Sequence, residues 1–173
     1  MTKGVRRTGK TRTDAERRRL SRASRDARSS PPPGPPAGWA VAWCDGGSRG
    51  NPGPAAYAYL IDTAEGVELA RAAVAIGVAG AAAAEHRGVL AALERALELG
   101  VGRLEVRSDS RLVIERMRGE SAPAGVGLGE LVRRSRDAAE RIGTVRFRWV
   151  PRDHNRAADA LVDERLHEPA AQG

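Results

Sequence analysis

Cysteine is almost absent from this 173-residue chain, which contains only Cys44. A lone cysteine excludes a disulfide framework and every cysteine-rich zinc site. No segment approaches the roughly 18 consecutive uncharged apolar residues of a membrane span, so we expect that this chain is not a membrane protein. The first ten residues are basic but lead into no apolar stretch, which argues against a secretory signal. These absences together predict a soluble protein of a reducing cytoplasm.

Lysine is also scarce, with two lysines beside 27 arginines in a chain of formal net charge +7. The positive excess lies in residues 1–38, which contain 11 basic and three acidic side chains. This arm has few apolar residues and ends in a proline-rich run, Ser29 to Pro36. We therefore predict that residues 1–38 form a disordered basic arm whose proline-rich end is a stiff spacer. Its arginines either bind nucleic-acid phosphates or are solvated without a dedicated partner.

The length suits one folded domain, which we place at residues 39–168, followed by a short tail at 169–173. Apolar periodicity and turn residues predict strands and helices in the order β-β-β-α-β-α-α-β-α. The expected strands are Trp39–Cys44, Ala55–Asp62, Val67–Val78, Arg103–Arg107 and Val145–Val150. The expected helices are Ala81–Leu99, Ser110–Arg118, a helix that follows a flexible link at Pro123–Gly129 and ends near Ile142, and Asn155–Leu166. A meander followed by crossovers predicts an α/β fold, with helices packed on a mixed sheet.

Four acidic residues lie at strand ends and helix starts, where a sheet of this kind usually carries its functional site. Asp45 and Asp109 each follow a strand, Glu85 shares the buried stripe of its helix with Val89, and Asp159 lies early in the last helix. Carboxylates gathered on one surface repel one another unless cations lie between them, and two divalent ions are what phosphodiester cleavage uses. Oxygen ligands favour Mg²⁺ or Mn²⁺ over zinc. Taken singly, each acid is better explained as a turn, cap or surface residue, and only their joint arrangement favours a metal site.

The residues Asp45–Ala55 (Asp-Gly-Gly-Ser-Arg-Gly-Asn-Pro-Gly-Pro-Ala) resemble the opening motif of the type 1 ribonuclease H family. Glu85, the run Ser108-Asp109-Ser110, and the segment from Val150 to Leu161 follow in the family's order. The resemblance covers about residues 39–168. It implies a ribonuclease H-like fold with a five-stranded mixed sheet, and a metal-dependent endoribonuclease. That enzyme would cut the RNA strand of RNA–DNA hybrids with two Mg²⁺ ions (Mn²⁺ is possible) and leave 5′-phosphate ends.

By that match the catalytic residues and metal ligands are Asp45, Glu85, Asp109 and Asp159. A backbone free of bulky side chains can approach a nucleic-acid groove and contact 2′-hydroxyls, although a glycine-rich stretch can also be a plain turn. The substrate-binding residues that we expect are Gly46, Gly47, Ser48, Asn51, Arg152 and Asn155. We expect the nucleic-acid partner to be a hybrid duplex, and the protein to be a monomer.

Several neighbouring residues have two readings. His154 either assists catalysis or is an ordinary exposed histidine, and we favour the second. His86 and His167 are predicted to be surface residues, and Asp163 to face solvent. Cys44 is predicted to be a small core residue rather than a nucleophile.

One segment departs from the family pattern. Relatives usually carry Thr-Asn-Asn before the glutamate, whereas this chain has Gly80 followed by four alanines. We therefore expect weaker hybrid binding by the isolated domain, with the basic arm compensating. Two other functions stay open: a catalytically weak or inactive nucleic-acid-binding module, and a 3′–5′ exonuclease of the same architecture.

Overall fold

The computed structural model describes residues 32–122 and 125–168, and one compact unit begins at Pro33. The predicted tail and most of the predicted basic arm lie outside the described residues. The elements are β1 (Ala40–Ser48), β2 (Gly53–Thr63), β3 (Glu68–Ala79), α2 (Ala81–Glu98), β4 (Arg103–Ser108), α3 (Arg111–Arg118), α4 (Val126–Ile142), β5 (Thr144–Trp149), the 3₁₀ turn η1 (Arg152–His154) and α5 (Arg156–His167). In the described part, no helix is both long and apolar enough to cross a membrane.

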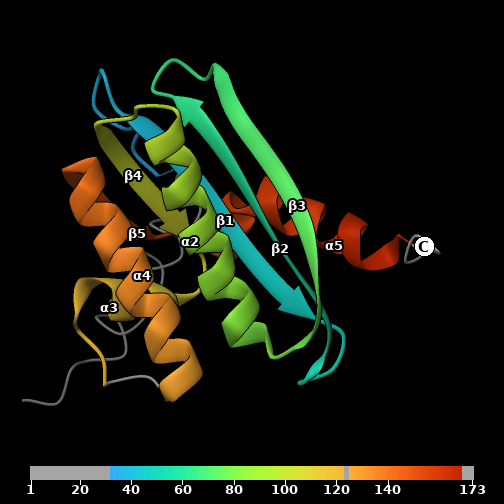
Figure 1. Ribbon diagram of the computed structural model, residues 1–173. Helices are drawn as coiled ribbons and strands as arrows, with labels where there is room; N and C mark the ends of the chain where they lie inside the picture. Colours follow the sequence, from blue (N-terminus) through green and yellow to red (C-terminus); the bar gives the residue numbers. More distant parts are fainter. Residues whose placement is uncertain (1–31, 123–124, 169–173) are drawn as a thin grey trace, which may run out of the picture. The chain divides into compact units, whose positions relative to one another are not determined.

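The five strands form one mixed sheet in the order β3-β2-β1-β4-β5 (Figure 1). Strands β1, β2 and β3 pair antiparallel through short turns, while β1–β4 and β4–β5 pair parallel through helical crossovers. The predicted α/β fold, the five-stranded mixed sheet and the order of its elements are therefore confirmed.

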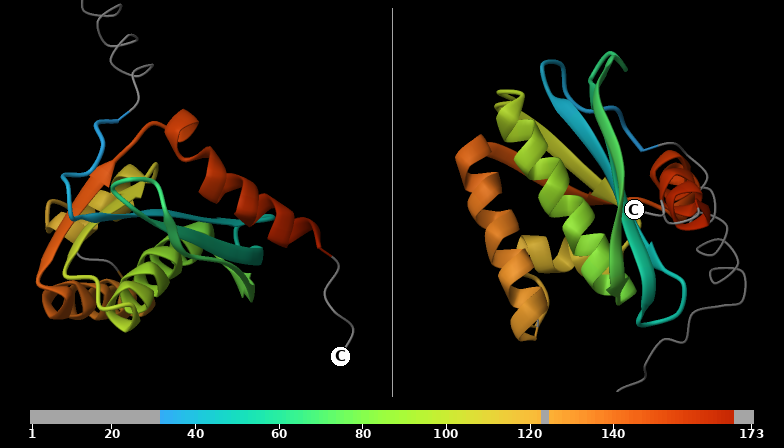
Figure 2. Two further views of the ribbon diagram at one scale, coloured as in Figure 1. Left: turned by 90° about the horizontal axis from the view of Figure 1, so that it is seen from above. Right: turned by 45° about the vertical axis from the view of Figure 1, so that its right-hand side comes forward.

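Helices cover both faces of the sheet. Helices α2 and α4 lie side by side on one face, and α5 lies on the other (Figures 1 and 2). The main core lies under α2 and α4, and its largest buried side chains include Ile61, Leu93 and Leu104. A smaller cluster joins Val162 of α5 to Ala56 and Ala58 of β2, where the small alanines let the helix approach the sheet closely.

Two predicted boundaries are wrong. Strand β1 does not end at Cys44 but continues to Ser48, since Asp45 pairs with Ala58 and Ser48 with Ala55 of β2. Helix α4 begins at Val126, so residues 126–129 are helical rather than a flexible link. Glycines at 127 and 129 lower local helix propensity, but packing of the buried helix face against the core overrides it.

The end of the proline-rich run is attached to the sheet. The buried Arg107 guanidinium of β4 donates Nη2–H to the Pro33 carbonyl oxygen at 2.6 Å and lies over the Trp43 ring at 4.8 Å. Arg107 also pairs with the buried Glu105 carboxylate at 2.6 Å. The described part of the spacer is therefore held at Pro33, because its carbonyl satisfies a buried charged donor.

Candidate active site

Asp45 lies inside β1 and is half-buried. Burial, the largest cause, and the negative charges of Asp109, Asp159 and Glu85 together raise the pKa of its carboxyl to about 7. The Gly46 backbone N–H, which donates to this carboxylate, acts in the opposite direction. The negative charges of Asp109, Asp159 and Glu85 therefore all act on Asp45, which lies in the central strand β1 beside the end of β4.

Glu85 stands in the second turn of α2, beside the end of β4. The Ser110 hydroxyl donates to Glu85 Oε2 at 2.8 Å. Burial raises the pKa of Glu85 and the charge of Asp109 adds to the rise, while Ser110 and the Arg116 guanidinium lower it. Ser110 follows Asp109 directly, so one short turn supplies a carboxylate and orients another.

Asp109 is held from two sides. Asn155 is 1% exposed, and its Nδ2 donates to Asp109 Oδ1 at 2.8 Å and to the Cys44 carbonyl at 2.9 Å. The Trp149 indole N–H donates to the Asp109 carbonyl at 2.9 Å. Asn155 was expected to contact substrate, but its burial makes it a positioning residue that ties α5 to β1 and Asp109. Sequence reasoning missed Trp149, because nothing in the strand pattern marks which aromatic N–H faces the site.

Asp159 forms an ion pair with an arginine. Arg152 Nη2 lies 2.5 Å from Asp159 Oδ1. Asp159 is the largest cause of the raised pKa of Arg152, and Asp109 and Asp45 raise it further. Arg152 was expected to contact phosphate, whereas its guanidinium here stands in the field of three of the carboxylates. The carboxylate cluster therefore attracts positive charge.

The donor chemistry of this cluster fits a hard divalent cation. All four acids offer oxygen atoms, and a cation would relieve the part of the raised pKa of Asp45 that comes from the neighbouring carboxylates. Within residues 32–122 and 125–168, no group of three or more His, Cys, Asp or Glu side chains already has the arrangement of a metal site. Three of the carboxylates are instead bound by side chains: Asp159 by Arg152, Glu85 by Ser110 and Asp109 by Asn155.

Gly46 is required where β1 meets α2. A β-carbon at Gly46 would overlap the backbone of Ala84 and Glu85, and one at Gly88 would lie 2.7 Å from the Asp45 carbonyl oxygen. The lack of a side chain at Gly46 is thus required by packing, and its predicted backbone contact with nucleic acid stays a prediction. This close approach of two backbones brings Asp45 and Glu85 together.

The other predicted substrate contacts lie near the end of β1. Gly47 faces α5, where a β-carbon would meet Val162 at 3.4 Å, and the Ser48 hydroxyl donates to the Gly50 carbonyl at 2.5 Å. Asn51 Oδ1 accepts the Ala81 backbone N–H at 3.3 Å. The four alanines that start α2 have no polar side chain, so Asn51 supplies the missing oxygen at this helix N-terminus. Contacts of these residues with nucleic acid stay predictions.

Two of the histidines differ in burial. His86 is fully buried, which contradicts the surface position expected for it; its Nε2 lies 3.4 Å from Arg116 Nη1. Burial and the charge of Arg116 lower the pKa of His86 to about 4. Helix α2 packs against the sheet, α3 and α4, so more of its circumference is buried than a one-sided stripe predicts. His167 and Asp163 are exposed, as expected.

Cys44 and His154 complete the predicted set. Cys44 is fully buried in the main core, which confirms its structural role, and burial raises the pKa of its thiol. His154 is half-buried in η1 rather than exposed as predicted, because this turn packs just before the buried Asn155; a role in catalysis stays a prediction.

Comparisons with known proteins identify the family and the fold. Residues 43–165 match the protein family described as "Reverse transcriptase-like". A bifunctional protein of Mycobacterium tuberculosis is 40% identical over 129 residues, which cover 74% of this chain and 35% of that protein. Ribonuclease HI of Halobacterium salinarum is 35% identical over 127 residues, covering 73% of this chain and 64% of that protein. The chain thus spans about a third of the length of its mycobacterial relatives.

Solved structures share the fold at similar identity. The N-terminal RNase H domain of the M. tuberculosis protein has a TM-score of 0.72 and 38% identity, covering 74% of this chain and 93% of that one. The H. salinarum RNase H1 has a TM-score of 0.71 and 35% identity, covering 74% and 97%. An LC11-RNase H1 in complex with an RNA/DNA hybrid has a TM-score of 0.69 and 31% identity, covering 73% and 96%. The matched family and the shared fold together show that this chain belongs to the ribonuclease H family that its motifs resemble.

Proposed function

We propose that this chain is a metal-dependent endoribonuclease that hydrolyses the RNA strand of RNA–DNA hybrids. The observation that carries the proposal is the meeting of four carboxylates beside the end of β4, where each of the other three raises the pKa of Asp45. A relative of the same fold has been solved with an RNA/DNA hybrid, which supports the substrate class.

Asp45, Glu85, Asp109 and Asp159 would hold two Mg²⁺ or Mn²⁺ ions. Such ions, when bound, supply an activated water and stabilise negative charge on the leaving oxygen. The chain's own contribution is orientation: Asn155 and Trp149 fix Asp109, and Ser110 fixes Glu85. Arg152 is largely exposed, so that once released from Asp159 it can pair with a phosphate at the cleavage site.

Replacing single carboxylates by amides tests the site. Asp45→Asn and Asp109→Asn each remove a negative charge with little change in volume, and we expect either variant to lose hybrid cleavage by about 10³-fold or more, because several kcal/mol of charge stabilisation disappear. The measurement is cleavage of an end-labelled hybrid with Mg²⁺, against EDTA. Full activity in either variant would contradict the assignment.

The same assay separates the two alternatives. Matched hybrid, double-stranded RNA and single-stranded RNA are offered to the full chain, and the hybrid should be cut preferentially. Binding without Mg²⁺-dependent turnover would identify a binding module instead. An end-blocked hybrid should be cut internally; products that appear only from free ends would identify an exonuclease.

A further inference from the structure

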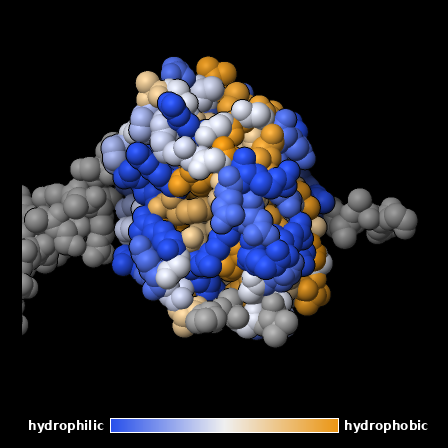
Figure 3. All heavy atoms as spheres, turned by 60° about the vertical axis from the view of Figure 1, so that its left-hand side comes forward, coloured by the Kyte–Doolittle hydropathy of each residue, from blue (hydrophilic) through white to orange (hydrophobic). Residues whose placement is uncertain are grey.

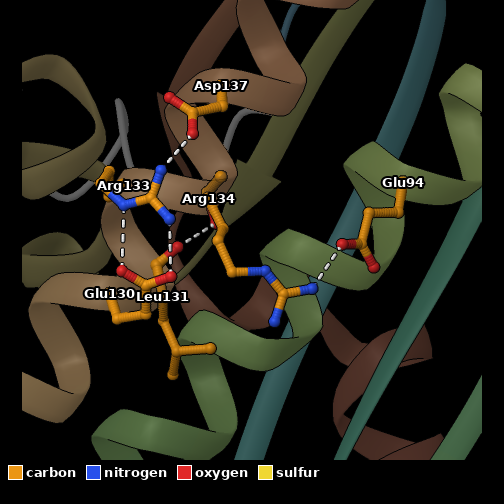
Figure 4. A network of polar contacts seen from close by, with 7 residues as sticks. Glu94, Glu130, Leu131, Arg133, Arg134 and Asp137 are labelled. Carbon is orange, nitrogen blue, oxygen red and sulfur yellow. Dashed lines mark hydrogen bonds and ion pairs between the residues drawn. The ribbon is translucent and has the colours of Figure 1, made fainter.

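Most of the positive charge of this chain precedes its folded unit. Residues 1–31 contain 11 basic and three acidic side chains, whereas residues 39–173 contain 18 basic and 19 acidic ones. On the side of the molecule that carries α4, the surface is mostly hydrophilic (Figure 3). Two arginines of α4 are nonetheless paired with acids, as Figure 4 shows: Arg133 with Glu130 and Asp137, and Arg134 with Glu94. Residues 1–31 therefore supply the excess positive charge that can attract nucleic-acid phosphates.

The folded unit begins beside the carboxylates. Its first residue, Pro33, accepts a hydrogen bond from Arg107, which lies opposite Trp43 in the β1–β4 register and over the Trp43 ring. Successive residues of a strand point to opposite faces, so Trp43 and Asp45 share a face and are about 7 Å apart along β1. The N-terminal segment lies on the same side of the sheet as α5, the helix of Asp159 (Figure 2).

The segment from Pro33 to Trp39 connects this contact to the start of β1. Trp39 precedes Asp45 by six residues, which corresponds to about 20 Å along an extended strand. Without the contact at Pro33, the chain that precedes the folded unit would be attached at that far end of β1. The contact moves the point of attachment to the level of Trp43, close to the carboxylates.

A buried ion pair holds the point of attachment in place. Arg107 is 2% exposed and Glu105 is 1% exposed, and Arg107 Nε donates to Glu105 Oε1 at 2.7 Å. Arg148 Nε lies 3.1 Å from the same oxygen. Pro33 is itself exposed, so water could solvate its carbonyl oxygen, whereas the buried guanidinium needs this acceptor for Nη2. The guanidinium is therefore fixed from the sheet side and in turn fixes Pro33.

We propose that the Pro33–Arg107 contact is an anchor that directs residues 1–31 to the hybrid near the phosphate that is cut. This inference rests on the proposed function and deepens it, since it assigns the anchor a role in substrate binding. An attachment about 7 Å rather than about 20 Å along β1 from Asp45 raises the effective concentration of the basic side chains at that part of the duplex. The anchor thus adds affinity without a further contact between the folded unit and the hybrid.

A cycle of two changes in the full chain tests the anchor. Glu105→Leu with Arg107→Met removes the buried pair and the donor to Pro33, and apolar replacements of similar volume often leave such sites folded. The second change replaces the 11 basic residues of 1–31 by glutamine. Affinity for a fluorescent hybrid is measured in EDTA for wild type, each variant and their combination. We expect anchor loss to weaken binding roughly 3- to 10-fold when the arm is basic and less than about 1.5-fold when it is neutral.

Removal of an exposed ion pair elsewhere is the control. Glu94→Gln with Arg134→Met deletes the pair between α2 and α4 (Figure 4) and leaves Pro33 untouched. This variant should bind within about twofold of wild type. Equal losses from the anchor variant with the basic and the neutral arm would indicate a purely structural effect and overturn the proposal, as would no loss in either. Thermal unfolding verifies that each variant is folded.

Neutral methylphosphonate linkages locate the basic residues on the duplex. The substrate is a DNA duplex with one short run of ribonucleotides, so that Mg²⁺-dependent cleavage fixes the position of the carboxylates. Linkages whose effect on kcat/KM disappears with the neutral arm mark the phosphates that residues 1–31 bind. In wild type these phosphates should lie within a few nucleotides of the cut, and in the anchor variant they should spread along the duplex. An even spread in wild type would contradict the proposal.

Failure of the proposed function gives a different result. A wild type that binds the hybrid but does not cut it with Mg²⁺ would refute the endoribonuclease. The affinity cycle in EDTA would still decide whether the anchor directs the basic residues to the hybrid, because it needs no cleavage.

Discussion

At the scale of single residues, charge repulsion and burial act most strongly on Asp45. Its carboxyl has a pKa of about 7 against an ordinary value of 3.8, with burial as the largest cause and Asp109 as the next. A group whose pKa is raised by folding destabilises the folded state when it ionises. The free energy of unfolding that is lost through ionised Asp45 therefore grows as pH rises from about 4 to about 7, and it is constant above that range.

Asp45→Asn should therefore stabilise the metal-free protein. In EDTA at pH 8 we expect a free energy of unfolding higher by about 1–3 kcal/mol, with the difference vanishing toward pH 4. Added Mg²⁺ should reverse the order, since binding to the folded state stabilises the wild type alone. Thermal unfolding at several pH values measures both effects. Asp163→Asn, at an exposed position, is the control, and an equal gain there would refute the explanation.

Asn155 is the second residue whose role is local. Asn155→Ala removes two buried hydrogen bonds, so we expect a loss of about 1–3 kcal/mol in unfolding free energy. It should also lower kcat more than it raises KM, because Asp109 loses its orientation while the binding surface stays. Asn155→Asp keeps the shape but sets a carboxylate against Asp109, and it should lose more activity than the alanine variant. Unchanged kcat in both would contradict a positioning role.

At the scale of elements, the site depends on how closely β1 and α2 approach. Gly46 of β1 faces the backbone of Ala84 and Glu85, and Gly88 of α2 faces the Asp45 carbonyl oxygen, so no side chain fits between the strand and the helix there. The contact places a residue of β1 and a residue of α2 on one surface, although 40 positions separate Asp45 from Glu85 in the sequence. The alanines of β2 have a similar effect for α5.

Two glycine-to-alanine substitutions should have opposite effects. Gly46→Ala forces β1 and α2 apart, and we expect a loss of about 3 kcal/mol or more together with loss of cleavage. Gly127→Ala lies in α4 with open space around the new methyl group, and it should add about 0.5–1 kcal/mol through helix propensity. Chemical denaturation measures both. Similar stability of the two variants would contradict a tight contact between β1 and α2 at Gly46.

At the scale of the whole molecule, the folded unit includes Pro33 of the proline-rich run. The Pro33 carbonyl oxygen accepts from Arg107, which is buried beside Glu105 and Trp43. Any truncation that includes Pro33 therefore alters the folded unit as well as the charge of the chain.

Two truncations should separate the effect of the arm's charge on hybrid binding from the effect of Pro33 on stability. Removal of residues 1–31 should leave the unfolding free energy unchanged while it lowers hybrid affinity and the salt slope, because most of the positive excess lies there. Removal of residues 1–36 should cost a further ~1–3 kcal/mol, since Arg107 loses a buried acceptor. Fluorescence anisotropy measures the hybrid affinity, and thermal unfolding measures the stability. Unchanged affinity after the shorter truncation would show that the arm is a solvated tail.

Much of the architecture could be predicted from particular residues. The turn at Asn51-Pro52, the stop at Gly100 and the alternation in Val145–Val150 mark elements whose existence and order the structure confirms. The boundaries at Ser48 and Val126 could not be predicted, because cross-strand pairing and core packing override the local preference of glycine.

The sequence by itself determined the type and order of the elements and which four acids have the chemistry for metal ions, because periodicity, turn residues and side-chain charge are local properties. Only the tertiary structure decided what surrounds those acids. It buried His86 and Asn155, used Gly46 for packing, set Arg152 against Asp159 and joined Pro33 to Arg107. Such roles depend on contacts between residues distant in the chain, and burial and pKa exist only once those contacts form.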